Sequence, residues 1–212
     1  IQEYLNYQIA ELFVNNEDWA HNNVLAWRPR TSDGVFRWVF FDVEGGFGLY
    51  DHNDYLNNLF DFKEDNFLLH RFLFERLLKN PQVKAQFIQG FASYLNSTFE
   101  SGRIIDLIQT MSAEIEKEME KDVARWAGYT TNGGSKCSPI NSMTQWRTHL
   151  AIMENFAKLR PDIIREQIKQ KFNLDGEVHV NFRSEGGSIT VNGVENVESG
   201  LYFKNIPLYL EA

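Results

Sequence analysis

Residues 16–23 read NEDWAHNN and residues 41–48 read FDVEGGFG, and these two stretches bracket the part of the chain that decides its fold. Between them, residues 24–28 and 35–41 are rich in the β-branched and aromatic side chains that are typical of strands. A short polar turn that ends in glycine joins the two runs. The sequence therefore predicts an antiparallel hairpin with a polar motif at each end.

The two motifs place Asp18 and Asn23 before the first strand, and Asp42 and Glu44 at the end of the second. Because an antiparallel hairpin returns its two ends to one place, we expect these side chains to lie close together. Protein kinases use an Asp, an Asn five positions later and an acidic turn beyond the next hairpin for phosphoryl transfer. The spacing here follows the same chemical logic, with one carboxylate for the substrate hydroxyl and further oxygens for a metal ion.

Each motif also has a purely local explanation. Asp18 and Asn23 suit Asx turns and helix caps, and the stretch from Asp42 to Gly46 suits a strand that ends in a glycine turn. For any one motif alone, the local explanation is the better one. Together, at one end of a hairpin, the residues favour a functional site.

The composition indicates a folded, acidic protein. The chain has 212 residues, 43% apolar and 14% aromatic, which is enough for one buried core and a small appendage. Its net charge of −8 argues against nucleic-acid binding, because phosphate contacts require a basic face. No apolar run reaches the roughly 20 residues of a membrane span, and no signal peptide is present. The five histidines lack zinc-binding spacing, and the single cysteine, Cys137, has no His partner at a recognisable distance.

The rest of the chain is predicted to be mostly helical. Apolar residues recur at helical spacing in residues 3–15, 67–79, 82–99, 101–127, 143–159 and 161–172. The pair Arg160-Pro161 favours a helix that ends and restarts at that point. In residues 101–127 the apolar side chains gather near one face and Glu and Lys on the other, which is typical of an amphipathic helix.

We therefore predict an α+β protein in two parts. Residues 1–175 form a mostly helical domain that carries the hairpin. In residues 176–212 the apolar period changes to two, which predicts a small β appendage without recognisable chemistry. The chain begins within a helical pattern and ends within a strand pattern, so we interpret it as a piece of a longer protein. On that interpretation the appendage is truncated and the targeting segment is not included.

The two motifs resemble those of the CotH kinase family, named for spore coat protein H, whose members are atypical relatives of protein kinases. In that family an Asn-x-Asp-Trp-x-x-Asn-Asn motif precedes a hairpin and an aromatic-Asp-x-acid-x-x-Phe-Gly motif follows it. Residues 16–23 and 41–48 match these patterns. Further similarity occurs at residues 76–80, 118–119, 125–126 and 160–165. The resemblance covers about residues 1–175 and implies a kinase-like C-lobe.

The resemblance assigns roles to four residues. Asp18 would be the catalytic base or an orienting carboxylate, and Asn23 and Asp42 would bind the ATP cofactor through a metal ion. That metal would be Mg²⁺ or Mn²⁺, held by Asn23, Asp42 and Glu44, and oxygen ligands of this kind suit Mg²⁺. Glu44 stands where the family usually has a second Asp.

The resemblance also implies an atypical protein kinase that transfers the γ-phosphoryl group of ATP to Ser or Thr of a coat or surface protein. It places the parent protein in the spore coat or at the cell surface. A kinase also needs a phosphate-covering loop and a strand Lys, and nothing in residues 1–212 matches them. We therefore interpret the chain as a C-lobe whose N-lobe is missing, and we expect it to be inactive alone.

Two alternative functions remain open from the sequence. The first is a non-catalytic module for surface or coat assembly or for carbohydrate-associated binding, which Glu44 and the β appendage favour. The second is a glycoside hydrolase, which would use two carboxylates about 5–10 Å apart across a sugar cleft. That chemistry explains the acids but not Asn23. The sequence does not decide whether the chain belongs to an active enzyme, or on which protein it acts.

Overall fold

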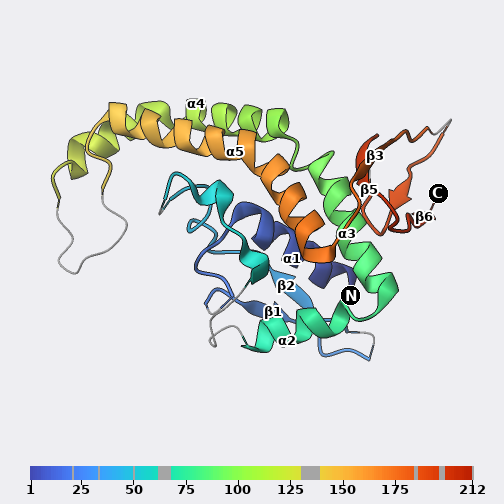
Figure 1. Cartoon of the computed structure of the whole chain (residues 1–212). Helices are drawn as coiled ribbons and strands as arrows, with labels where there is room; N and C mark the ends of the chain where they lie inside the picture. The colour runs from blue at the N-terminus through green and yellow to red at the C-terminus, as the bar shows by residue number, and fades with distance from the viewer. Residues whose placement is uncertain are drawn as a thin grey trace.

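A computed structural model of the chain describes residues 1–20, 22–32, 34–49, 51–61, 68–129, 139–183, 186–195 and 199–211. Its helices are α1 (Gln2–Val14), α2 (Leu68–Leu77), α3 (Pro81–Leu95), α4 (Ser101–Trp126) and α5 (Met143–Phe172), with short 3-10 helices η1 (Asp54–Leu56) and η2 (Leu59–Asp61). Its strands are β1 (Leu25–Trp27), β2 (Arg37–Val39), β3 (Glu177–Val180), β4 (Thr190–Val191), β5 (Gly200–Phe203) and β6 (Leu210–Glu211). This arrangement confirms the predicted α+β class (Figure 1). His21 and Cys137 lie outside the described residues.

The predicted hairpin is formed by β1 and β2, which pair antiparallel with Leu25 opposite Val39. It packs against the first half of α1, where the ring of Trp38 lies 4.8 Å from the ring of Tyr4 in an edge-to-face arrangement. An exposed ion pair between Arg37 and Glu3 spans the same contact. The hairpin is therefore fastened along α1, which places its open end near the last turn of that helix.

The core forms where α1 meets α3 and α5. On α1, the side chains of Leu5, Ile9 and Leu12 are at most 1% exposed, and their spacing places them on one face of the helix. On α3, Phe87 and Phe91 are fully buried and their rings lie 5.9 Å apart. Helix α1 is therefore the central support for the polar loop that follows it.

The prediction of two helices around Pro161 was wrong, because α5 runs unbroken from Met143 to Phe172. Proline has no N–H to donate to the carbonyl of Ala157, and the helix changes direction along its length (Figure 1). Phe156 and Ile164, on either side of the proline, are both at most 1% exposed. Burial of both halves in the core therefore outweighs the local stop signal.

Helix α4 lies alongside α5, and the two helices extend together away from the rest of the molecule (Figure 1). Within α4, all of whose residues are described, Ile104 and Ile108 are the buried members of the predicted apolar face. Met111 and Ile115 are exposed. The amphipathic pattern was predicted correctly, but its apolar face is covered near the body of the molecule and uncovered beyond it.

The C-terminal strands pack against α3 and enter the same core as α1. Strand β3 pairs antiparallel with β5, and β4 pairs antiparallel with β6. The side chains of Val191, Tyr202 and Phe203 are at most 1% exposed and belong to the main apolar cluster. Gln89 on α3 donates a hydrogen bond to the backbone oxygen of Phe203 at 2.8 Å. These strands therefore share the hydrophobic core of the helices.

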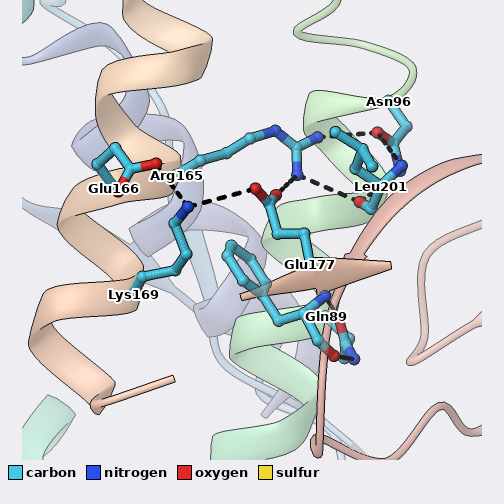
Figure 2. A network of polar contacts seen from close by, with 8 residues as sticks. Gln89, Asn96, Arg165, Glu166, Lys169, Glu177 and Leu201 are labelled. Carbon is cyan, nitrogen blue, oxygen red and sulfur yellow. Dashed lines mark hydrogen bonds and ion pairs between the residues drawn. The ribbon is translucent and has the colours of Figure 1, made fainter. Parts of the chain in front are cut away.

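A largely buried ion pair joins the end of α5 to β3 (Figure 2). Arg165 Nη1 lies 2.7 Å from Glu177 Oε1, and the two side chains are 8% and 15% exposed. Arg165 Nη2 also donates to Asn96 Oδ1 at 2.8 Å, and Asn96 Nδ2 donates to the backbone oxygen of Leu201 at 3.1 Å. Lys169 adds a second positive charge 3.6 Å from Glu177. One polar network thus connects α5, the end of α3 and the strands β3 and β5.

Candidate functional site

The open end of the hairpin brings Asp18, Asn23 and Asp42 together. Because Leu25 lies opposite Val39, continuing the register places Asn23 opposite Phe41, the residue before Asp42. The Asn23 Nδ2 group donates to Asp18 Oδ2 and to the backbone oxygen of Asp42, each at 3.3 Å. The amide of Asn23 therefore connects the loop before the hairpin to the loop after it.

Asn23 and Asp42 both have a left-handed backbone, with φ of 58° and 55°. Among residues with a side chain, Asn and Asp adopt this conformation at the lowest cost. The residue types at these two positions therefore also have a local structural cause, as the sequence suggested. Their convergence, however, depends on the pairing of β1 with β2 and not on the local conformation.

Asn16 is a central member of the site, although the sequence did not indicate a role for it. Its side chain is completely buried, and its Nδ2 group donates to Glu11 Oε2 at 3.0 Å and to the backbone oxygen of Asp42 at 3.3 Å. Its Oδ1 atom accepts a hydrogen bond from the backbone N–H of Asp18 at 3.3 Å. Asn16 therefore links α1 to both loops that carry the predicted site residues.

Glu11 supplies the fixed end of this linkage from within α1. Its carboxyl group is fully buried, and burial raises its pKa to about 7, while Asn16 and the Tyr7 hydroxyl lower the pKa by a smaller amount. Trp19 Nε1 donates to the Tyr7 hydroxyl at 2.7 Å, which holds that hydroxyl beside the site. The spacing of Tyr4, Tyr7 and Glu11 on one helix face was the sequence signal that could have indicated a buried acid here.

The loop that follows Asp42 is held against the end of α1. The N–H of Phe47 donates to the backbone oxygen of Val14 at 3.1 Å. A Cβ atom on Gly46 would lie 2.4 Å from the same oxygen, so a larger residue cannot occupy this position without moving the loop. Gly46 therefore allows the close approach that keeps the acidic loop in register with Asn16.

Arg160 of α5 binds the last turn of α1 from the other side. Its guanidinium group donates to the backbone oxygens of Leu12 at 2.7 Å and Phe13 at 3.0 Å, and also to those of Tyr55 and Asn57. Burial lowers its pKa to about 9, so the group stays mostly protonated at neutral pH. A cation at the C-terminus of a helix satisfies free carbonyl groups and opposes the negative end of the helix dipole. Arg160 thus fixes the end of α1 from which Asn16 projects.

The predicted site residues differ in their exposure. Asp18 and Asn23 are half-buried, whereas Asp42 and Glu44 are exposed. Asp42 and Glu44 also line a pocket of about 590 Å³ that lies between their loop and α5. The structure therefore separates a half-buried pair from two accessible carboxylates at the edge of a pocket.

The predicted metal ligands offer carboxylate and amide oxygens, which are donors of the type that Mg²⁺ takes from proteins. Across the described part of the chain, no three His, Cys, Asp or Glu side chains gather as a metal-binding group. Mg²⁺ characteristically takes one or two carboxylates from a protein and its remaining ligands from water and substrate phosphates. The carboxylates of Asp42 and Glu44, together with the amide oxygen of Asn23, match that requirement.

Comparison with known proteins identifies the family. Residues 1–164 match the family described as CotH kinase protein, and this range includes both motifs, the hairpin and most of α5. The comparisons with curated proteins and with solved structures found no match. None of the described helices combines the length and the apolar character that a membrane crossing requires. The chain belongs to the CotH kinase family.

Proposed function

We propose that this chain carries the catalytic and metal-binding residues of a protein kinase that transfers the γ-phosphoryl group of ATP to Ser or Thr of a coat or surface protein. The observation that carries the proposal is the side-chain amide of Asn23, which bonds both the Asp18 carboxylate and the Asp42 backbone. It brings a candidate base and a candidate metal ligand to one place from two loops. Membership of the CotH kinase family supports the same chemistry.

Asp18 is the residue that we propose as the base. Its carboxylate is half-buried and accepts a hydrogen bond from Asn23, and its backbone N–H is held by Asn16. A carboxylate held in this way can orient a substrate hydroxyl and receive its proton as the new P–O bond forms. The role depends on the position of the carboxylate, because the proton leaves late in a loose phosphoryl-transfer transition state.

Asn23, Asp42 and Glu44 are the residues that we propose to hold Mg²⁺ or Mn²⁺ with the nucleotide. A divalent metal ion neutralises the charge of the phosphate oxygens when it is bound. The Nδ2 group of Asn23 donates to Asp18 and Asp42, and the oxygen of the same amide is the atom that we propose as a metal ligand. Glu44 is exposed, and its side chain is one methylene group longer than that of the Asp usual at this position, so its carboxylate can still reach a metal ion.

We propose that this chain alone holds ATP weakly. Residues 1–212 contain no Gly-rich loop followed by a strand Lys, and these groups cover the phosphates in protein kinases. A measurement of ATP affinity for residues 1–212 with Mg²⁺ or Mn²⁺ tests this expectation. Micromolar binding would contradict it.

The decisive experiment is a γ-phosphoryl transfer assay with the full-length protein and ATP, with Mg²⁺ or Mn²⁺. Asp18→Asn and Asp42→Asn should each lower turnover by at least about a hundredfold, the usual size of a general-base or electrostatic contribution. The matched control is Asp122→Asn, which makes the same charge change at an exposed position on α4. Absence of autophosphorylation and of labelling of any partner by the wild type contradicts the proposal.

A non-catalytic binding module is the second candidate. The observation that favours it is Glu44, which replaces the usual Asp and is exposed at the edge of the site. Such a module would bind Mg²⁺ without turnover. A Glu44→Asp variant that gains phosphoryl transfer from an inactive wild type would identify this chain as the non-catalytic form.

A further inference from the structure

The pocket beside the acidic loop is bordered by two of the proposed metal ligands, Asp42 and Glu44, but the roles proposed above do not use its apolar walls. It measures about 590 Å³, within the range of roughly 300–1,000 Å³ that is typical of ligand-binding pockets. Its walls combine many apolar side chains with a few polar groups, the combination that binding pockets use for affinity and orientation. The pocket is therefore a candidate binding site by size and by chemistry.

One wall of the pocket is a single face of α5. His149, Ile152 and Met153 occupy positions i, i+3 and i+4, which lie next to one another on a helix surface. The facing wall is the loop after β2, which contributes the apolar side chains of Val43 and Leu49. A mostly apolar space thus separates the acidic loop from a helix.

The pocket is built by packing that fixes the distance between its walls. The ring of Phe47 lies 4.8 Å from the ring of Phe156 on α5. A Cβ atom on Gly48 would lie 2.7 Å from the Ile152 side chain, so the loop approaches the helix as closely as a glycine permits. The loop carries the proposed metal ligand Asp42, and the position of the pocket relative to that carboxylate is therefore set by the fold.

We propose that this pocket binds an apolar side chain of the acceptor polypeptide, next in sequence to its Ser or Thr. The inference rests on the proposed function, because it concerns the substrate of that same site. Asp42 and Glu44 belong both to the proposed metal site and to the pocket wall, so a residue bound in the pocket lies beside the reacting group. A residue next to the acceptor Ser or Thr is the part of the substrate that can enter a pocket bordered by the proposed metal ligands.

Charge indicates which acceptors the pocket disfavours. The pocket walls are mostly apolar, and the whole chain has a net charge of −8. An Asp or Glu next to the acceptor hydroxyl would have to leave water for this apolar space, which is costly for a charged group. The pocket therefore selects for Phe, Leu or another large apolar residue and against an acidic one.

The test uses direct binding of labelled peptides to the chain, measured by fluorescence anisotropy. The peptides contain one Ser and differ in the residue beside it, which is Phe, Leu, Ala or Asp. Burial of a large apolar side chain should make the Phe and Leu peptides bind on the order of tenfold more tightly than the Ala peptide. The Asp peptide should bind most weakly.

Two variants place the preference in this pocket. Met153→Trp fills the space from α5, and Leu49→Asp adds a charge from the loop, at a side chain that is 42% exposed and so tolerates the change. Each should remove the preference for Phe over Ala while leaving the affinity of the Ala peptide within about twofold. Ala151→Trp, at an exposed position on the same helix, is the matched control and should leave the preference intact. Thermal unfolding of each variant verifies that it is folded.

The outcomes separate this inference from the proposed function. Equal binding of the Phe and Ala peptides, or an equal loss for both in Met153→Trp and Leu49→Asp, overturns the pocket assignment. Displacement of the Phe peptide by ATP also overturns it, since the pocket would then belong to the nucleotide. If the Phe preference is present and no phosphoryl transfer is found, the pocket assignment holds and the kinase proposal fails. If phosphoryl transfer is found without a preference for the Phe peptide, the kinase proposal holds and the pocket assignment fails.

Discussion

The side chain of Asn16 donates one hydrogen bond to the buried carboxyl group of Glu11 and a second to the backbone oxygen of Asp42. Glu11 is part of α1, whereas Asp42 follows the second strand of the hairpin. Both Asn16 and Glu11 are completely buried, so water cannot replace either bond without a rearrangement of the core. The acidic loop is thereby attached to the most central helix of the fold.

Replacement of Asn16 by Asp should destabilise the protein strongly. The change keeps the shape of the side chain but removes both Nδ2 donors and places a second carboxyl group 3.0 Å from Glu11. A buried donor lost in this way costs about 1–3 kcal/mol, and like-charge repulsion adds to that cost. Urea unfolding at pH 8 measures the effect. Asn22→Asp, in the same loop but exposed, is the control, and an equal loss in both variants would show that the Asn16 bonds contribute nothing.

Replacement of Glu11 by Gln should change how stability depends on pH. The pKa of Glu11 rises from 4.5 to about 7 on folding, so the folded state holds this proton more tightly than the unfolded state. The stabilisation is complete below pH 4.5 and is lost as the pH rises through 7. A pKa difference of this size corresponds to a stability change of about 3 kcal/mol at most. Glu11→Gln stays uncharged, so its stability relative to the wild type should increase between these two pH values and level off above them.

The measurement is urea unfolding of the wild type and of Glu11→Gln between pH 4.5 and 8.5, with the difference between the two plotted against pH. Glu114→Gln, at an exposed position on α4, provides a control for loss of one negative charge. A flat difference for Glu11→Gln would mean that Glu11 titrates near its ordinary value in the folded protein. In that case burial would not raise the pKa of Glu11.

Replacement of Arg160 by Met should be among the most destabilising changes in the chain. It removes the donors that Arg160 supplies to the backbone oxygens of Leu12, Phe13, Tyr55 and Asn57, of which Asn57 keeps a second donor in Gln167. We expect a loss of roughly 3–5 kcal/mol, the cost of disrupting a buried charged network. Thermal and urea unfolding measure it. Arg30→Met, at an exposed position, should cost less than about 0.5 kcal/mol, and a similarly small effect for Arg160→Met would contradict the assigned role.

A double-mutant cycle on Arg165 and Glu177 tests whether the C-terminal strands fold together with the helices. The two charges are 2.7 Å apart and largely buried, so Arg165→Met and Glu177→Gln should be coupled by about 1–3 kcal/mol. The exposed pair of Arg147 and Glu116 lies at a similar distance of 2.9 Å and should give less than about 1 kcal/mol. Urea unfolding should also remain a single transition. A separate early transition would show that residues 177–211 unfold independently of α5.

The hairpin could be predicted because strand alternation and turn chemistry are local properties. The adjacency of Asn23 and Asp42 then followed from antiparallel pairing, and the structure gives the hydrogen bond between them. Glu11 on α1 and Asn16 in the loop after it were not assigned roles, since a single polar residue gives no sign by itself of whether it is buried. The apparent helix break at Pro161 was a local preference that burial of both flanking turns overrides.

The sequence alone determined the helical periods, the hairpin and the two polar motifs, because each depends on residues that are near neighbours in the chain. Only the tertiary structure decided that Glu11 is buried, that Asn16 bridges it to Asp42, and that Arg160 holds the end of α1 from 147 positions away. The bonds from Asn16 to Asp42 and from Arg160 to α1 join residues that are distant in sequence, and the strength of all these contacts comes from exclusion of water, which no local pattern encodes. The sequence thus predicts the candidate site residues, whereas the contacts that position them depend on the packed core.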